Sequence, residues 1–250
     1  MNKSQISSWC SREIEMIMVL MKSVPIIVPV LFVFAVVAMN MLSRINLLSL
    51  PWLALNAGIL ISWLSFLLLD VVVKHYGARA ANLLSVLAII VNLICTLICV
   101  VVGRIWQYPV LDTLVGGQWS ILLASTTAFL VSTLTNNYTN ISIGRKFKHN
   151  PDGKTAFATR SFISTFISQI VDNFIFVFLA FVVLPLIPSA FQLHWTIVQC
   201  IGCSITCAGL ELLSEVIFSP IGYRMLKKWK EQDVGREYLD KYCPKGVLGE

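Results

Sequence analysis

The sequence predicts an all-α integral membrane protein with six transmembrane helices, and three observations support this fold class. Hydrophobic residues make up 57% of the 250 residues and charged residues only 13%, whereas a soluble domain typically carries about 25% charged residues. Apolar runs of about 20 residues recur along the chain. Lys and Arg gather in every second connection between these runs, as in multi-pass membrane proteins.

Six apolar runs are long enough to cross about 30 Å of hydrocarbon as helices. They cover residues 24–42, 51–73, 80–102, 111–135, 161–186 and 193–218. None shows the alternation of apolar and polar residues that is typical of a membrane β-barrel. The sequence therefore divides into an N-terminal segment (1–23), a six-helix transmembrane domain (24–218) and a C-terminal tail (219–250).

The N-terminal segment carries Glu13 and Glu15 beside its basic residues, and the apolar run that follows exceeds the core of a signal peptide. We therefore expect a retained helix at the membrane interface. After Pro220 the tail predicts a short charged helix, whose lysines would lie near anionic lipid.

The distribution of basic residues predicts the orientation. Seventeen of the 19 Lys and Arg residues lie in 1–23, 74–79, 145–160 and 219–250, and the other connections hold only Arg44 and Arg104. Because basic loops stay in the cytoplasm, both termini should be cytoplasmic. The net charge of +6 is then explained by topology, and no nucleic-acid partner is predicted.

The longest polar connection, residues 144–160, separates two sets of three spans. With an odd number of spans in each set, related halves would be related by inversion, a common plan among transporters. No internal sequence similarity is evident, so the inverted halves are a hypothesis.

The fifth predicted span contains a polar group, Gln169, Asp172 and Asn173, in the stretch SQIVDNFIFVFLAF. Asp172 lies twelve residues after Arg160, which is about 18 Å along a helix and close to the bilayer midplane. A carboxylate there costs at least about 2.5 kcal/mol and by default indicates a functional site. The alternative is a hydrogen bond that joins two helices.

Other spans also carry polar groups. Asp70 precedes Lys74 by four residues, which indicates either a structural ion pair or part of a polar pathway. Glu211 lies on the polar face of the sixth span. Cys200 and Cys203 lack a second cysteine pair and are interpreted as small buried hydrophobes. No metal, cofactor or catalytic residue is expected, and no phosphate-binding loop motif occurs.

Five short motifs occur in order over about residues 35–230: Ala38-Met-Asn40-x-x-x-Arg44, Asn56-Ala57-Gly58, Asp70-x-x-x-Lys74-His-Tyr76-Gly77-x-Arg79-x-Ala81, Ser168-Gln169-x-x-Asp172-x-x-x-Phe176-x-x-x-Ala180-Phe181 and Glu215-x-x-x-Ser219-Pro220. Together they resemble the queuosine precursor transporter family, also called the vitamin uptake transporter family. Two positions depart from the family pattern: Trp63 stands where a proline is expected, and Glu211 stands where a basic residue is expected.

The resemblance implies six helices in the bacterial inner membrane and uptake of 7-deazaguanine compounds for salvage into tRNA modification. These compounds are cyano- or aminomethyl-deazaguanine, queuine and queuosine. The expected partners are a deazapurine base or nucleoside and the lipid bilayer. The sequence leaves the exact compound, the coupling ion and the oligomeric state open, a homodimer included.

A guanine-like edge suits the candidate residues. It presents an N1 hydrogen beside an exocyclic amino group, and one carboxylate can accept both hydrogen bonds. We therefore expect Asp172 to bind this edge. The remaining expected substrate-binding residues are Gln169, Asn173 and Asn40 for the other polar atoms, and Asp70 and Glu211 for an aminomethyl cation or a coupling proton.

Three other interpretations remain open at this point. In the first, the chain is the substrate-binding subunit of another vitamin or nucleobase uptake system, and a separate ATPase supplies the energy. In the second, the chain is a membrane hydrolase in which Cys200 and Cys203 are metal ligands. In the third, the chain is an assembly protein whose polar helix faces only join the helices to one another.

Overall fold

The computed structural model describes residues 3–107, 117–144 and 154–243. The chain forms two compact units, each built from separate stretches of sequence. Unit 1 comprises Met1–Val37, Ile61–Val91 and Glu215–Glu250, and unit 2 comprises Ala38–Leu60 and Asn92–Ser214. The units do not follow the predicted division into two sets of three spans.

Four helices in the described ranges are long and apolar enough to cross a membrane: Ile59–Tyr76, Ala78–Gly103, Thr165–Leu186 and Ile197–Phe218. A fifth results if the bent pair Ser11–Ser23 and Ile27–Leu42, with 108° between its helices, forms one span. The predicted run 111–135 lies partly outside the described residues. The multi-pass helical class is confirmed, whereas the sixth span, the cytoplasmic termini and the inverted halves remain predictions.

Unit 1 has its core where several helices meet around Tyr76. It contains α1 (Lys3–Ser23), parts of α2 (Ile27–Leu42), α3 (Ile59–Tyr76), α4 (Ala78–Trp106) and α8 (Ile197–Glu231), and α9 (Arg236–Tyr242). Tyr76 is 0% exposed, and its hydroxyl donates to the carbonyl oxygen of Ser23 at 2.7 Å. Its ring packs against Trp229 and Tyr238. Burial raises the pKa of Tyr238 to about 12.

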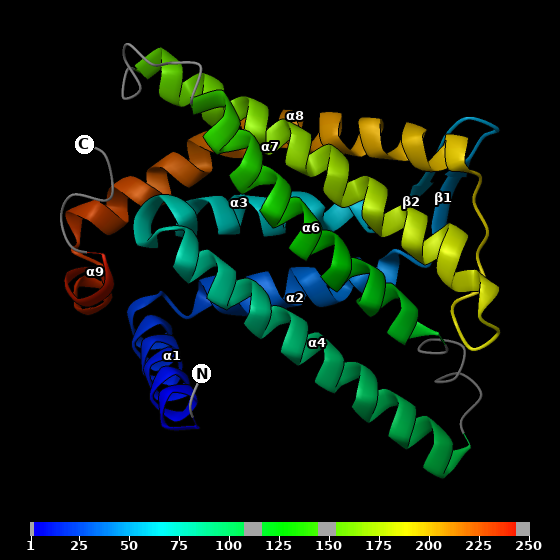
Figure 1. The fold of residues 1–250 in the computed structure, drawn as a ribbon, viewed down its shortest axis with the longest axis horizontal. Helices are drawn as coiled ribbons and strands as arrows, with labels where there is room; N and C mark the ends of the chain where they lie inside the picture. The colour runs from blue at the N-terminus through cyan, green and yellow to red at the C-terminus, as the bar shows by residue number, and fades with distance from the viewer. Residues whose placement is uncertain (1–2, 108–116, 145–153, 244–250) are drawn as a thin grey trace. The chain divides into compact units, whose positions relative to one another are not determined.

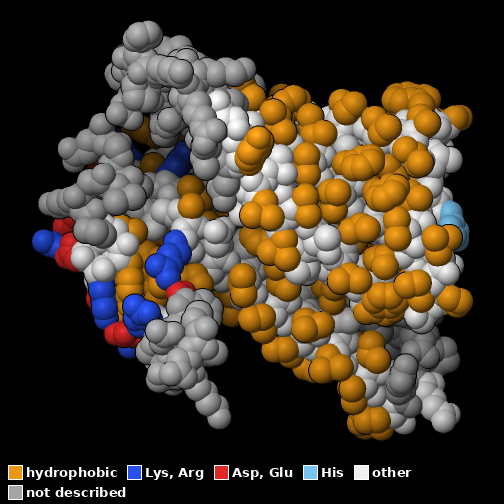
Figure 2. All heavy atoms as spheres, in the orientation of Figure 1, with side chains coloured by type: hydrophobic (Ala, Val, Ile, Leu, Met, Phe, Trp, Pro, Cys, Tyr) orange, Lys and Arg blue, Asp and Glu red, His pale blue; other side chains and the backbone are white. Residues whose placement is uncertain are grey.

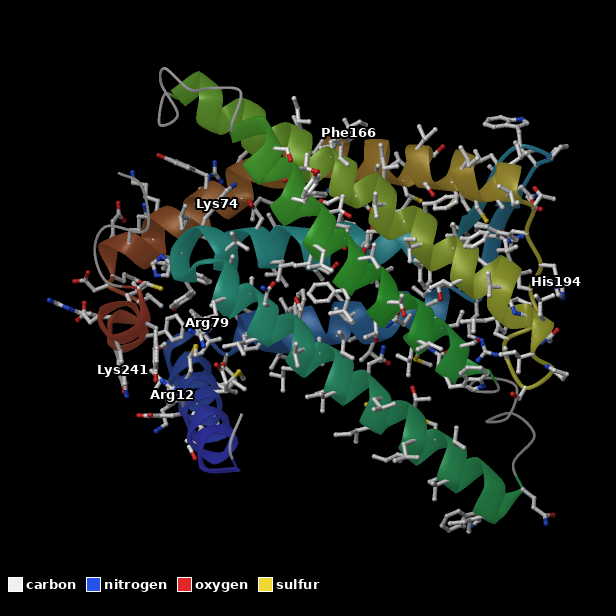
Figure 3. All side chains as sticks on the ribbon, viewed as in Figure 1. Arg12, Lys74, Arg79, Phe166, His194 and Lys241 are labelled. Carbon is white, nitrogen blue, oxygen red and sulfur yellow. The ribbon has the colours of Figure 1, made fainter. Side chains whose placement is uncertain are left out.

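Two ion pairs fasten α1 within unit 1. Arg79 of α4 donates to Glu13 at 2.6 Å, and Lys241 of α9 donates to Glu15 at 2.6 Å. Figure 3 shows Arg79 and Lys241 on the side of the unit where α1 lies. The hydrogen bond to Glu15 raises the pKa of Lys241. The expected N-terminal helix is therefore present, and its contact with lipid remains a prediction.

Helix α8 corrects the prediction of a separate short helix after Pro220. It runs from Ile197 to Glu231 with Pro220 inside it. Proline removes one helical hydrogen bond, but the residues beyond it are held by packing: Gly222 lies against Leu67 and Val71, and Trp229 is buried in the core of unit 1. Tertiary contacts thus keep the helix continuous.

Unit 2 is organised around two long helices, α6 (Gln118–Gly144) and α7 (Lys154–Phe178), which pack along each other (Figure 1). Helix α7 continues into a π-helical turn, Leu179–Val183, and a 3-10 turn, Leu184–Leu186. The unit also contains the second half of α4, from Asn92, and the first part of α8. Over α6 and α7, the surface drawn in Figure 2 is mostly hydrophobic, as expected for helices that contact lipid.

A short β-hairpin occupies residues that were predicted to begin a span at 51. Strands β1 (Asn46–Ser49) and β2 (Ala54–Asn56) pair antiparallel, and α3 begins only at Ile59. Leu50 N–H donates to the carbonyl oxygen of Leu53 at 2.7 Å and closes the turn that contains Pro51. The prediction of an apolar helix start was wrong because this turn interrupts the apolar run.

The hairpin packs on the start of α8 through backbone atoms. Gln199 Nε2 donates to the carbonyl oxygen of Leu50 at 2.8 Å. One turn further along α8, a Cβ on Gly202 would collide with the carbonyl oxygen of Trp52. Glycine at 202 is therefore required for this close approach.

Candidate functional site

Two consecutive residues of α7 bind two different helices of unit 2. Asp172 Oδ1 accepts a hydrogen bond from Ser132 Oγ of α6 at 2.8 Å. Asn173 Nδ2 donates to both carboxylate oxygens of Glu211 of α8, at 3.2 and 3.1 Å. Consecutive positions of a helix point about 100° apart, which directs the two side chains to different neighbours. We call Ser132, Gln169, Asp172, Asn173 and Glu211 the polar layer.

Two buried residues of this layer, Gln169 and Glu211, both accept hydrogen bonds from Asn173, whereas the side-chain oxygen Oε1 of Gln169 has no hydrogen-bond partner in the part of the chain that the structure describes. Glu211 is 4% exposed and Gln169 6% exposed, and Asn173 Nδ2 also donates to the backbone carbonyl oxygen of Gln169 at 2.9 Å. Asp172 and Asn173 are partly exposed. The carboxylates of Asp172 and Glu211 both lie in helices that are long and apolar enough to cross a membrane.

The Asp172 carboxylate keeps capacity to bind a ligand. A carboxylate offers about four acceptor positions, and Ser132 occupies one on Oδ1. Among the residues that the structure describes, no second side chain is hydrogen bonded to it. Asp172 is partly exposed as a residue, and Ser132 leaves about three of the four acceptor positions of its carboxylate unused.

Aromatic rings follow the polar layer along α7. Phe174 and Phe178 stack with ring centroids 5.5 Å apart, and Phe181 packs on Trp195 at 4.4 Å. The π-helical turn starts at Leu179, seven residues after Asp172. Single π-helical turns inside helices often accompany functional sites.

Asn40 lies apart from the polar layer. Its carbonyl oxygen accepts a hydrogen bond from Gln118 Nε2 at 3.5 Å. Gln118 precedes Ser132 by fourteen residues within α6, which corresponds to about 21 Å along the helix. The structure thus gives Asn40 different neighbours from those of Asp172. We call residues 40–56, 117–120 and 187–199 the hairpin end of unit 2.

Asp70 belongs to unit 1 and is paired there. Its carboxylate accepts from Lys74 Nζ at 2.6 Å, and the side chains of Lys74 and Asp70 are 58% and 44% exposed. This is the i to i+4 ion pair that the sequence predicts. Of the six predicted site residues, the structure brings together Gln169, Asp172, Asn173 and Glu211 in unit 2 and gives Asn40 other neighbours there, whereas Asp70 belongs to unit 1.

Sequence reasoning missed Ser132 and Gln118. Ser132 is one of many hydroxyl residues in α6, and only the packing of α6 on α7 singles it out. Gln118 is buried at the start of its helix, 2% exposed. The predicted run 111–135 places Gln118 inside a span with several other polar residues, so nothing in the sequence distinguishes it from them.

Cys200 and Cys203 are both fully buried, as predicted for small hydrophobes. Within the described ranges, no three His, Cys, Asp or Glu side chains are grouped closely enough to hold a metal ion.

Comparison with known families gives one match. The family model described as "Putative vitamin uptake transporter" matches residues 56–225, about two thirds of the chain. This range contains the polar layer and Gln118. Searches of curated proteins and of solved structures gave no match.

Proposed function

The chain belongs to the vitamin uptake transporter family, and we propose that it imports queuosine precursors across the bacterial inner membrane. Family membership and the apolar helices support a multi-pass membrane protein with a small-molecule substrate. The proposed substrates are 7-deazaguanine compounds, namely cyano- and aminomethyl-deazaguanine, queuine and queuosine. Their salvage would supply tRNA modification.

The observation that carries this proposal is the Asp172 carboxylate. It lies in an apolar helix, is partly exposed and receives its described side-chain hydrogen bond from a neutral hydroxyl. A guanine-like edge offers two adjacent N–H donors, and a carboxylate accepts such a pair in a bidentate manner. We assign this contact to Asp172.

The rest of the polar layer supports the same substrate class. The Asn173 amide nitrogen is directed at Glu211, which leaves its carbonyl oxygen as an acceptor for other substrate N–H groups. Glu211 places a second carboxylate against Asn173, the residue that follows Asp172. We propose that it balances the charge of an aminomethyl group or carries a coupling proton.

An uptake screen tests the proposal. Cells that lack both precursor synthesis and their own transporter would express the full chain and receive each precursor in turn, with other vitamins and nucleobases as comparison compounds. We expect uptake of at least one 7-deazaguanine and an at least tenfold loss with Asp172→Asn at equal protein levels in the membrane. Uptake of another compound class alone would contradict the proposal.

One observation favours a second interpretation, in which the polar layer only joins helices. The Ser132–Asp172 and Asn173–Glu211 hydrogen bonds each connect two helices. Ser132→Ala separates the two interpretations, because it removes one bond and keeps the carboxylate. If Asp172 binds substrate, Ser132→Ala keeps most uptake and Asp172→Asn loses it. If the layer only joins helices, Ser132→Ala lowers uptake and thermal stability at least as much as Asp172→Asn, because the amide oxygen of Asn still accepts from Ser132.

A further inference from the structure

We propose that Gln118 is a second substrate-reading residue, which accepts a hydrogen bond from a ring N–H of the transported base at the hairpin end of unit 2. Asn40 and Arg44 would complete this position. The inference rests on the proposed function and extends it to a site about 21 Å along α6 from Ser132.

The Gln118 side chain is buried with an unused acceptor. It is 2% exposed, and its Oε1 atom has no hydrogen-bond partner among the described residues. Its Nε2 atom donates to the Asn40 carbonyl oxygen at 3.5 Å, at the long limit for a hydrogen bond. Buried acceptors without a donor are rare and costly. A ligand that brings an N–H group would remove this cost.

Several contacts fix Gln118 in this position. The preceding residue, Gly117, has φ +72° and lies so close to the backbone of Phe191 that no Cβ fits. Phe191 N–H donates to Ser120 Oγ at 3.1 Å, and Trp119 Nε1 donates to the carbonyl oxygen of Ser189 at 2.9 Å. These contacts attach the start of α6 to residues 187–196. The backbone that carries the Gln118 side chain is therefore fixed by its surroundings.

Arg44 adds a donor to the same cluster. Its guanidinium lies 4.6 Å from the ring centroid of Phe191, the residue whose backbone touches Gly117. Arg44 also follows Asn40 by four residues. The cluster thus combines an acceptor on Gln118, a cationic donor on Arg44 and an aromatic face on Phe191.

This combination fits a planar base with a carbonyl oxygen beside a ring N–H. The N–H would donate to Gln118 Oε1, and the carbonyl oxygen would accept from Arg44. A guanine-like edge carries a carbonyl oxygen, a ring N–H and an amino group in a row. The carbonyl oxygen and the ring N–H suit Arg44 and Gln118, whereas the ring N–H and the amino group suit Asp172. One base cannot reach two positions about 21 Å apart, so they would be occupied in succession. The charge distribution predicts that the hairpin end is outside, so Gln118 would be reached first.

Direct binding measurements on the purified full-length protein test the inference. The probes are 7-cyano-7-deazaguanine and its N1-methyl derivative, which lacks the ring N–H. The variants are Gln118→Leu, which removes the acceptor, Gln118→Glu, which keeps one, and Gln192→Leu as a control, because Gln192 is an exposed glutamine of the same end. Thermal unfolding of each variant reports whether it folds.

We expect Gln118→Leu to weaken binding of the parent base on the order of tenfold and to bind the N1-methyl base like the wild type. Gln118→Glu and Gln192→Leu should stay within about threefold of the wild type. An equal loss for both bases with Gln118→Leu, or no loss for the parent base, would overturn the role of Gln118. If the wild type binds neither base, the inference for Gln118 fails, whereas the deazaguanine proposal fails only if the uptake screen also finds no transported 7-deazaguanine.

Discussion

Unit 1 and unit 2 use polar residues in different ways. In unit 1 the polar contacts include ion pairs between exposed or partly exposed side chains, such as Arg79–Glu13 and Lys241–Glu15. In unit 2 the carboxylates of Asp172 and Glu211 receive hydrogen bonds from neutral groups inside apolar helices. Exposed ion pairs contribute little energy each, whereas a carboxylate within a span is costly and is retained for a reason.

Two of the motifs that resemble the family lie in different units and make these two different kinds of contact. The motif from Asp70 to Ala81 lies in unit 1, where Tyr76 is the centre of the core and Arg79 holds α1. The motif from Ser168 to Phe181 lies in unit 2 and carries the polar layer. A motif shared with a transporter family therefore does not by itself indicate substrate contact.

The largest effect on stability is expected at Tyr76. Tyr76→Ala removes a ring that is 0% exposed and its hydrogen bond to Ser23, so it should destabilise the protein by about 3 to 5 kcal/mol. Tyr223→Ala is the control, because Tyr223 is 68% exposed in the same unit. Thermal unfolding in detergent measures both. Similar unfolding temperatures for the two variants would contradict a core around Tyr76.

A smaller but clear effect is expected where the hairpin meets α8 in unit 2. Gly202→Ala places a Cβ against the Trp52 carbonyl oxygen and should cost about 1 to 3 kcal/mol. Gly209→Ala is the matched control on the same helix, since nothing lies within 4 Å of its added Cβ, and it should stabilise slightly. If Gly202→Ala unfolds at the same temperature as Gly209→Ala, the hairpin does not pack as described.

The smallest effect is expected for an ion pair of unit 1. Glu13→Gln removes one charge of the Arg79–Glu13 pair, in which Arg79 is 63% exposed and Glu13 20% exposed. We expect a loss below about 1 kcal/mol, and this loss should shrink further at high salt. Unfolding at two salt concentrations measures it. A loss as large as that of Tyr76→Ala would show that charge, and not packing, holds α1.

The helices were largely predictable from the sequence, because apolar composition determines which segments enter a membrane. The exceptions have local causes. The turn at Pro51 replaces the start of a span by a hairpin, and packing of Trp229 keeps α8 helical through Pro220. Hydropathy reports neither a tight turn nor a tertiary contact.

The candidate site was predictable only in part. The polar character of Gln169, Asp172, Asn173 and Glu211 is visible in the sequence, because such residues stand out in apolar spans. Their partners depend on which helix faces overlap, so Ser132 did not stand out among its neighbouring hydroxyls. Asn40 was grouped with Asp172 on residue type alone, and distance along α6 separates them.

The central claim is that the carboxylate of unit 2, and not that of unit 1, binds the substrate. The most direct test compares uptake of a 7-deazaguanine by Asp172→Asn and Asp70→Asn at equal amounts in the membrane. Both variants exchange one carboxylate for an amide of the same size within a candidate span. We predict an at least tenfold loss for Asp172→Asn and less than a twofold loss for Asp70→Asn. Equal losses, or a larger loss for Asp70→Asn, would contradict the claim.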